Sequence, residues 1–346
     1  MPLHTTHIKL TPTATGSAPA GSEGTVYYDS SVDALRQYGT SYRSTFPVYS
    51  IELLMVAGGG GGNLGAYAGG GGGAGGVLNK TISVIPGTVY VVGVGAGGHQ
   101  GCNGQSSTFG EHIAYGGGAG SQAKFAVGEP SSGGEAGGAA AGRPGGSGGG
   151  ASEGGSGSPG GGGAYPSSAL GIQTSPRQGY NGGSTVGSGN NCGAGGGGAG
   201  AAGVNAPLND SGEGGDGVNT YDTWLQAVES SQALGEEISS VRWIAGGGAG
   251  GGHYGAANSA AGGKGGGGNG PSSHNASNGT AGTALSGGGG GAGTSYSGWA
   301  GKAGGSGFVM FRYAGGSALN SAGNITPVVS GGYVYHLFTS TGTYTA

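Results

Sequence analysis

Charged residues, cysteines and long apolar runs are all scarce in this chain. Only 8% of its 346 residues are charged, and the 11 lysines and arginines form no cluster. Proteins that bind nucleic acid normally carry a basic patch, so we expect no nucleic-acid partner. No stretch of about 18 apolar residues occurs, which argues against insertion into a membrane.

The two cysteines, Cys102 and Cys192, are too few for a disulfide framework and lack the C-x-x-C spacing of redox and metal motifs. We interpret both as free thiols that serve as small residues. The first seven residues, MPLHTTH, lack the charged and apolar regions of a secretory signal peptide. Export through a signal-peptide pathway is therefore not expected.

Glycine is the residue that the chain has in excess. Of its 98 glycines, only four precede Gly58 and six follow Gly307, and many form unbroken runs such as residues 58–62. A glycine has no side chain to bury and loses more backbone entropy on folding than any other residue. Order in this region must therefore come from backbone hydrogen bonds and close backbone packing.

Three structures are open to such runs. A flexible coil, like a glycine-serine linker, is the simplest alternative. A collagen helix is excluded, because runs of five glycines break the Gly-X-Y period and proline is sparse. The third structure is the extended threefold helix of polyproline, whose amides point outward and can bond to neighbouring helices. We favour helices of this kind, each making one pass through a bundle, with the short inserts as turns.

Apolar segments with the character of β-strands flank and interrupt the glycine-rich region. Residues 51–57 (IELLMVA) form a continuous apolar run that ends in glycine, as a buried strand does. Residues 81–85 and 89–94 alternate on either side of a Pro-Gly turn, which predicts a β-hairpin. One short helix is expected within residues 223–234. Further strands are predicted in a hairpin at 24–38, with a helix at 32–38 as the alternative, and at 107–109, 113–115, 241–245, 308–313 and 333–344.

These elements predict an all-β fold with at most one short α-helix. A small β-sandwich forms the base, and glycine-rich loops or packed polyglycine type II helices emerge from it. The predicted regions are an extended N-terminal arm (1–24), a β-hairpin with the strand that leads into the glycine (25–57), the glycine-rich domain (58–313) and a C-terminal β-hairpin tail (314–346).

No motif predicts catalysis, a cofactor or a metal site. Residues 93–98 match G-x-G-x-x-G, but a chain so rich in glycine matches it by chance, and no helix follows. Asp210, Glu213 and Asp216 share one turn and could bind Ca²⁺, although solvated loop charges explain them more simply. The histidines could hold an ion only through tertiary contacts. We expect a non-enzymatic protein, because a glycan hydrolase would need a carboxylate pair that only tertiary structure could assemble.

Aromatic residues in the glycine-rich inserts are the candidate receptor or glycan contacts. Tyr and Trp combine rigid area with a polar tip, which suits sugar rings and protein surfaces. The alternative is that they cover the sides of the bundle or a subunit interface. The candidates are Tyr165, Tyr180, Tyr221, Trp224, Tyr254, Tyr296 and Trp299.

Several segments together resemble the glycine-rich modules of tail fibres and related virion proteins of tailed bacteriophages. They are IELLMVA running into glycine at 51–62, PGT at 86–88 before the strand at 89–94, STFG at 107–110 and GGSGFVMFRY at 304–313. Residues 24–31 (GTVYYDSS) are similar to a hairpin near the start of phage structural proteins. In such modules a segment like residues 335–344 usually precedes the strand that leads into glycine, whereas here it follows the glycine-rich region.

The resemblance implies an oligomeric virion appendage protein whose polyglycine helices carry receptor-contacting loops, and it transfers no catalytic residue. Its partners would be copies of itself, other virion proteins and a host-surface glycan or protein. Its location would be a virion appendage or the extracellular space.

The C-terminal segment is a candidate for joining subunits. An unpaired apolar strand would be an aggregation liability. The C-terminal segment either folds back onto the sheet of residues 51–57 or inserts into the next subunit. Insertion into the next subunit would produce a head-to-tail filament. We therefore expect a structural and adhesive protein of a tail fibre, with a self-polymerising extracellular filament as the alternative. The residues concerned are Tyr333, Tyr335, Leu337, Phe338 and Tyr344.

Overall fold

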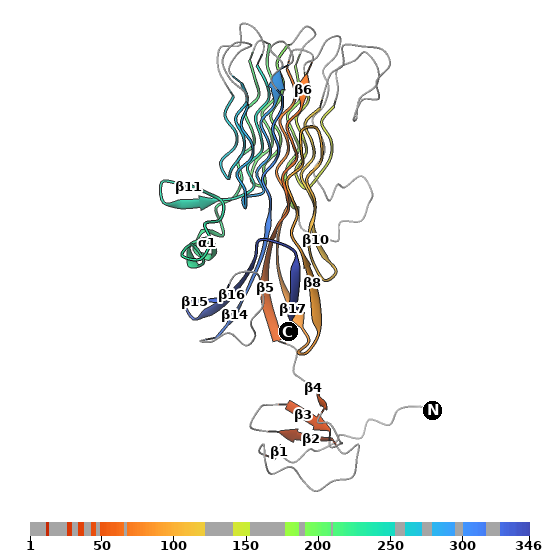
Figure 1. Cartoon of the computed structure of the whole chain (residues 1–346), viewed down its shortest axis with the longest axis vertical. Coiled ribbons are helices and arrows are strands. Elements are labelled where there is room, and N and C mark those ends of the chain that lie inside the picture. The colour runs from red at the N-terminus through yellow and green to blue at the C-terminus, as the bar shows by residue number, and fades with distance from the viewer. Residues whose placement is uncertain are drawn as a thin grey trace, which may run out of the picture.

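Two antiparallel β-sheets form the base of the protein in the computed structural model (Figure 1). Backbone alone is described for residues 12–13, 26–29, 34–37 and 43–45. The structure otherwise describes residues 49–65, 68–121, 141–152, 177–186, 191–208, 210–252, 260–271, 279–294, 300–315 and 326–346.

The sheets have five and four strands, and every neighbouring pair in them is antiparallel. The five-stranded sheet has the order β15-β16-β14-β5-β7 and the four-stranded sheet the order β10-β9-β8-β17. Their bounds are β5 (Tyr49–Val56), β7 (Val77–Val84), β8 (Val89–Gly93), β9 (Ser107–Phe109), β10 (His112–Ala114), β14 (Phe308–Ala314), β15 (Val328–Ser330), β16 (Tyr333–Phe338) and β17 (Gly342–Thr345).

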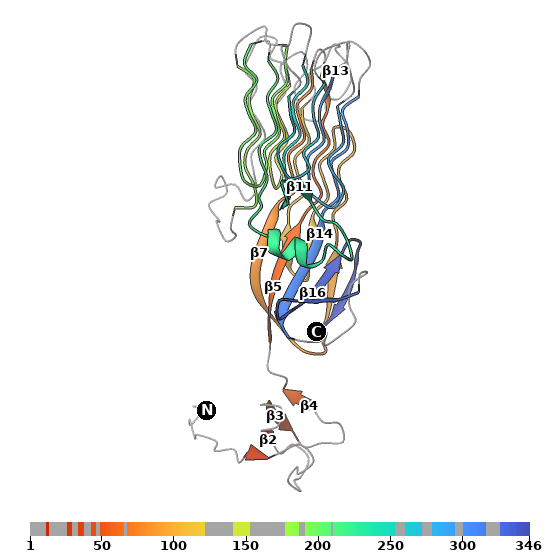
Figure 2. The ribbon, with the colours of Figure 1, turned by 90° about the vertical axis from the view of Figure 1, so that its left-hand side faces the viewer.

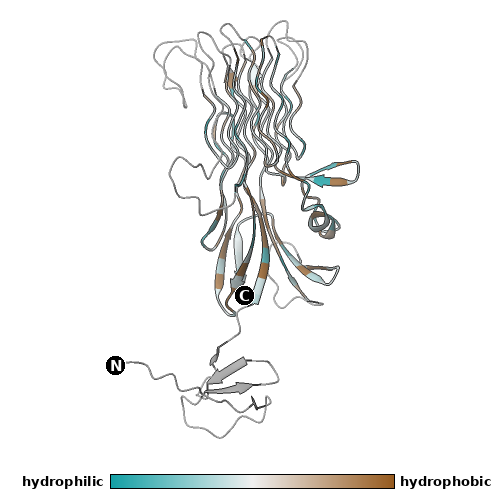
Figure 3. Cartoon of the chain, turned by 180° about the vertical axis from the view of Figure 1, so that it is seen from behind, coloured by the Kyte–Doolittle hydropathy of each residue, from teal (hydrophilic) through white to brown (hydrophobic). Residues whose placement is uncertain are grey.

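The two sheets pack face to face and enclose the main apolar core. Alternate residues of a strand point to opposite faces, so Ile51 and Leu53 of β5 face the four-stranded sheet, where Phe109 and Tyr344 meet them. All four side chains are fully buried. Figure 3 shows brown, apolar segments along the strands of the base. The predicted β-sandwich is confirmed.

The outer face of the five-stranded sheet is covered by an insert from the glycine-rich region. This insert comprises α1 (Asp222–Ala227), β11 (Glu236–Ile238) and β12 (Val241–Trp243). Trp224 and Leu225 of α1 join Leu54 and Met310 of the sheet in a second buried cluster. Figure 2 shows α1 in front of β5 and β14. The single short helix predicted within 223–234 is confirmed, and it ends earlier than the apolar pattern suggested.

Beyond the base, the glycine-rich region forms a bundle of extended passes (Figure 1). Strands of the base continue directly into it, as β5 does into residues 57–63 and as residues 68–76 do into β7. We call this part the glycine bundle. Its described residues are 57–65, 68–76, 94–106, 115–121, 141–152, 177–186, 191–208, 210–217, 244–252, 260–271, 279–294 and 300–307.

Hydrogen bonds between passes recur at every third residue. Ala57, Gly60 and Asn63 all donate backbone hydrogen bonds to the antiparallel pass at 70–76, with N to O distances of 2.8–3.1 Å. The intervening residues donate to two other passes, and three further passes donate to residues 58–63. A three-residue repeat without internal hydrogen bonds is that of the polyproline-type helix. The predicted packed helices are therefore present, each interior one among six neighbours.

Close approach of the passes leaves no room for side chains. A Cβ atom built on Gly60 would lie 2.2 Å from the carbonyl oxygen of Gly118. One built on Gly72 would lie 2.1 Å from the carbonyl oxygen of Gly60. Both distances are far shorter than any non-bonded contact between such atoms, so glycine is required here by packing rather than by a special φ angle.

A separate four-stranded sheet lies N-terminal to the base. It has the order β1-β2-β3-β4, with bounds β1 (Pro12–Thr13), β2 (Val26–Asp29), β3 (Ala34–Gln37) and β4 (Arg43–Thr45). The antiparallel pairing of β2 with β3 confirms the hairpin predicted at 24–38. Within the predicted N-terminal arm (1–24), Pro12–Thr13 pairs with β2 as a parallel strand.

Two predicted hairpins are wrong, although their strands are present. β7 and β8 follow one another across the Pro86-Gly87 turn but pair in different sheets, β7 with β5 and β8 with β9 and β17. β16 and β17 are likewise split between the two sheets. Each connection crosses the sandwich, because both strands have an apolar face that must reach the same core. The actual hairpin of the C-terminal region joins β15 to β16.

A hydrogen-bonded pair of tyrosines, one buried and one half-buried, joins the two sheets. The Tyr49 hydroxyl on β5 lies 2.5 Å from the Tyr344 hydroxyl on β17. Burial raises the pKa of Tyr344 above its ordinary value, and the hydrogen bond with Tyr49 adds to this shift. Burial likewise raises the pKa of Tyr49. Because the folded pKa values are raised, stability from this pair is fully present below about pH 10 and is lost as pH rises above it.

We predict that Gly60→Ala destabilises the protein strongly, since the new methyl group meets backbone that cannot move aside. Overpacking costs about 1–3 kcal/mol or more. The matched control is Gly315→Ala, where the Cβ atom would lie 3.6 Å from the nearest atom of Val334. Urea unfolding of both variants measures the difference, and equal midpoints would contradict the packing argument.

We also predict that stability falls above pH 10 and that Tyr344→Phe makes this fall shallower. At pH 8 the variant should lose about 0.5–1.5 kcal/mol, the value of one hydrogen bond. Denaturant unfolding at pH 8 and pH 11 measures both effects. Tyr115→Phe, on a half-exposed ring, serves as the control and should retain the full pH dependence. A Tyr344→Phe curve that follows the natural chain at both pH values would refute the assignment.

Candidate functional site

At the end of the glycine bundle away from the base, several chain segments lie side by side. Here β6 (Leu64–Gly65) pairs in parallel with β13 (Gly293–Thr294). Gly69 donates a backbone hydrogen bond to Gly293, and Gly251 donates one to Gly69. Successive passes therefore reach this end side by side. We call it the loop end of the bundle.

Polar side chains help to order the loop end. The Asn63 amide nitrogen donates to the carbonyl oxygen of Gly120 at 3.1 Å, while its amide oxygen accepts from the backbone N–H of Leu64 at 2.8 Å. Asn63 is almost fully buried. One side chain thus links two passes where the chain leaves the bundle.

Four of the predicted contact residues lie outside the described residues. They are Tyr165, Tyr254, Tyr296 and Trp299. The described chain stops at Gly252 before Tyr254, and at Thr294 before Tyr296. Gly251 and Thr294 both belong to the loop end. The segment that contains Tyr254 and the segment that contains Tyr296 and Trp299 therefore begin there.

Tyr180 lies on the flank of the glycine bundle. Its ring is partly exposed, and the Arg177 guanidinium carbon sits 4.5 Å from the ring centroid. Its carbonyl oxygen accepts from the N–H of Gly148 at 3.0 Å. Gln178 lies between Arg177 and Tyr180 in the sequence. Its side-chain amide nitrogen donates to the Ile113 carbonyl at 2.9 Å, which ties the pass to β10. The pass that carries Tyr180 is thus fixed by backbone and side-chain hydrogen bonds.

Tyr221 and Trp224 belong to the insert that covers the base. Tyr221 precedes α1, and burial raises the pKa of its phenol. Its ring meets the Trp224 ring edge-on, with centroids 6.2 Å apart. Trp224 is only 7% exposed, so it packs against the base as the alternative interpretation held and offers no face to a receptor.

Arg312 on β14 fixes the insert to the five-stranded sheet. Its guanidinium carbon lies 4.2 Å from the centroid of Trp224 and 4.0 Å from that of Tyr333. Two guanidinium nitrogens also donate to one carboxylate oxygen of Glu52, at 2.8 and 3.1 Å. A planar cation held between two rings and a carboxylate makes a rigid junction. No local sequence pattern indicates this junction, because its members are far apart in sequence.

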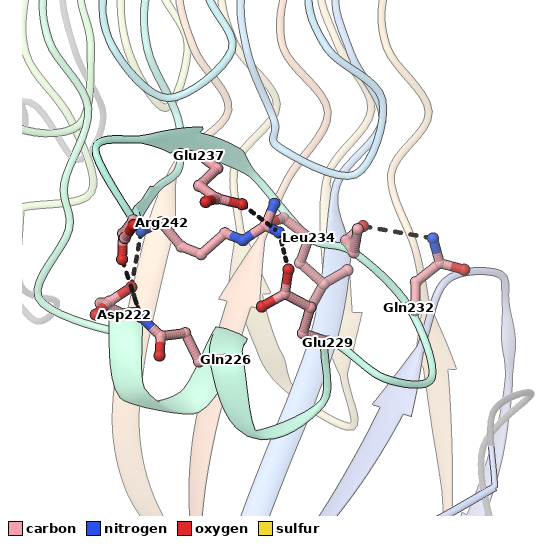
Figure 4. A network of polar contacts seen from close by, with 9 residues as sticks. Asp222, Gln226, Glu229, Gln232, Leu234, Glu237 and Arg242 are labelled. Atoms are coloured by element: carbon pink, nitrogen blue, oxygen red, sulfur yellow. Dashed lines mark hydrogen bonds and ion pairs between the residues drawn. The ribbon is translucent and has the colours of Figure 1, made fainter.

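A polar network links α1, β11 and β12 within the insert (Figure 4). Arg242 on β12 forms ion pairs with Glu229 and with Glu237, the latter at 3.1 Å. Asp222 accepts from the Arg242 backbone N–H at 2.7 Å, which ties the start of α1 to β12. Gln226, one turn along α1, donates to the same carboxylate at 2.9 Å. The network keeps the helix and the hairpin in one unit.

The insert is also attached to the glycine bundle. One carboxylate oxygen of Glu236 accepts hydrogen bonds from the N–H groups of Gly265 and Gly266, at 2.8 and 2.9 Å. Lys264, in the same turn, pairs with Asp216 at 3.4 Å and lies 5.2 Å from the Trp243 ring centroid. Base, insert and bundle are therefore coupled through side chains as well as by chain connection.

The candidate subunit-joining residues all lie in strands that pair within the chain. Of the two alternatives, the structure has the one in which the segment folds back. β16 enters the sheet of β5 through β14, and β17 pairs with β8. Tyr335, Leu337, Phe338 and Tyr344 are buried and Tyr333 is half-buried.

Within the described ranges, no group of three His, Cys, Asp or Glu side chains is placed to hold a metal ion. Asp210, Glu213 and Asp216, which lie close together in the sequence, form no such group; Asp210 accepts from the N–H of Ser211, and Asp216 pairs with Lys264. In the part of the chain that the structure describes, no helix is long and apolar enough to cross a membrane.

Comparison with known proteins places the chain in a family. A family model described as a glycine-rich domain matches residues 36–314, and the chain belongs to that family. The matched region spans the glycine bundle, the insert and most of the base, and excludes the strands β15, β16 and β17. Searches of curated proteins and of solved structures return no match.

We predict that Arg312→Lys lowers the free energy of unfolding by about 1–3 kcal/mol, since an ammonium group cannot stack on two rings and fork to Glu52 at once. Arg177→Lys is the matched control, because that guanidinium also stacks on a tyrosine but is exposed. It should change stability by less than about 0.5 kcal/mol. Chemical denaturation measures both variants, and equal losses would show that the junction adds nothing.

Proposed function

We propose that this protein is a non-enzymatic structural and adhesive component of a phage tail fibre or a similar virion appendage. The loop end of the glycine bundle would contact a receptor on the host surface, either a glycan or a protein. The protein would work as an oligomer together with other virion proteins. Membership of the glycine-rich domain family supports the scaffold part of the proposal.

The observation that carries the proposal is the convergence of the passes at one end. Each pass is locked to its neighbours by backbone hydrogen bonds, so the connections between passes start from fixed points. Loops on a rigid scaffold are the usual place for binding residues, because they vary without disturbing the core. Predicted aromatic contacts such as Tyr254, Tyr296 and Trp299 fall in segments that begin at this end.

The structure of the base also supports the proposal. Its apolar side chains are enclosed between two sheets and beneath the insert, so it provides stability away from the loop end. The alternative filament would require β16 or β17 to leave sheets in which their side chains are buried. For this reason we put forward the adhesive function alone.

The test is binding of the purified protein to a panel of bacterial strains and to a glycan array. We predict that replacing Tyr165, Tyr254, Tyr296 and Trp299 together by Ala reduces binding at least tenfold, since hot-spot aromatics each contribute about 2 kcal/mol or more. The melting temperature should not change, because the bundle and the base are untouched.

The control variant removes exposed apolar area at the base instead. Val89 and Val91 on β8 are 59% and 61% exposed, and replacing both by Ala should leave binding unchanged. Binding that survives the fourfold variant would remove the loop end from the proposal. Failure of the natural chain to bind any strain or glycan would count against adhesion itself.

A further inference from the structure

The outer face of the four-stranded sheet is exposed and rich in β-branched side chains. Val89 and Val91 of β8 are 59% and 61% exposed, and Ile113 of β10 is 40% exposed. Alternate residues of a strand point to the same face, and the strand register places these side chains in adjacent cross-strand rows. The β-branched residues of this face are Val89, Val91, Thr108, Ile113, Thr343 and Thr345. We call it the β8 face.

The five-stranded sheet shows two kinds of outer face for comparison. Beneath the insert, Leu54 and Met310 are apolar and fully buried. On β7, which pairs with β5 at the edge of that sheet, the residues on the same face are the exposed and polar Asn79, Thr81 and Ser83. A sheet face in contact with water is normally polar in this way. The β8 face therefore has the composition of a covered face together with the exposure of an uncovered one.

The absence of charge on the β8 face favours a second copy of this chain as its partner. Among the described residues of the four strands, none on this face is charged, and Glu111 lies at its edge in the turn between β9 and β10. A partner that is selected by charge would find no group to pair with on the face itself. Two copies present the same neutral surface to each other, so they can meet without burying an unpaired charge.

The size of the β8 face sets the strength of such a contact. Three rows of side chains on four strands cover roughly 300–400 Å² in the plane of the sheet. A standard interface buries about 800 Å² on each partner, so this contact belongs to the weak class and needs about micromolar or higher concentration. Receptor-binding assays at lower concentration measure the single chain, and the alanine control at Val89 and Val91 keeps its meaning there.

We propose that two copies of this chain associate through their β8 faces, related by a two-fold axis. The two sheets pack face to face, as the two sheets within each base already do. Because the β8 face belongs to the base, the loop ends of both copies stay free. The inference rests on the oligomeric part of the proposed function and names its interface. Its test involves no receptor, so its failure and a failure of adhesion are distinguishable.

Sedimentation velocity of the full chain between about 1 and 300 μM tests the proposal. The natural chain should sediment as a monomer at the lowest concentration and increasingly as a dimer at the highest. Val91→Lys should weaken the dimer at least about tenfold, since it places an unpaired charge in the interface. Thr81→Lys puts the same charge on the exposed face of β7 and should associate like the natural chain. A natural chain that stays monomeric throughout, or a Val91→Lys variant that associates equally well, overturns the proposal.

Methyl NMR of the natural chain locates the contact without any substitution. Raising the concentration should shift the methyl resonances of Val89, Val91 and Ile113. Val186 and Leu208 are the internal control, because they are similarly exposed, at 50% and 60%, but lie in the glycine bundle. Their methyl resonances should not move. Shifts at Val186 and Leu208 in place of the β8 face would put the association on the bundle and overturn the proposal.

Discussion

Backbone hydrogen bonding between passes that carry almost no side chains is the constraint on which this structure depends. A polyproline-type helix has no internal hydrogen bonds, so each N–H and C=O group must find a partner on another pass. Residues 57–63 illustrate the result, with three passes accepting their hydrogen bonds and three donating to them. No pass can be ordered alone, and a side chain in the interior would push two passes apart.

Base and bundle are stabilised by different forces and depend on each other. Large apolar residues such as Phe311 and Leu53 are gathered in the base, where burial of apolar area operates in the ordinary way. The base in turn sets the position of the passes, because β5, β7 and β14 run directly into them. Arg312 and Glu236 extend this coupling to the insert. The loop end is thus held rigid by contacts made far from it.

Sequence patterns located most strands but not their partners. The apolar runs that became β5 and β14 were evident from residue type, as was the helix that contains Trp224. The turn at Pro86-Gly87 was also evident, but alternation on both sides of a turn does not say whether the chain returns in the same sheet or crosses to the opposite one. The Arg312 junction gave no local signal, since Glu52 lies 260 residues away. The sequence supplied aromatic candidates such as Trp299, which lies outside the described residues, while the topology of the passes located the end at which the segment after Thr294 begins.

The sequence by itself determined that the molecule has two parts, a β-rich base and a glycine-rich region. A region without side chains can be ordered only by its backbone, and the apolar runs on either side supply a β-rich base. Composition was therefore enough to predict an all-β fold whose glycine-rich part forms either loops or packed polyglycine helices, and the structure has the helices. Which pass lies beside which, and which strands share a sheet, was decided only by the tertiary structure. The physical reason is that glycine carries no side chain to specify a neighbour, so the order of the passes comes from the base strands, the insert and the turns that connect them.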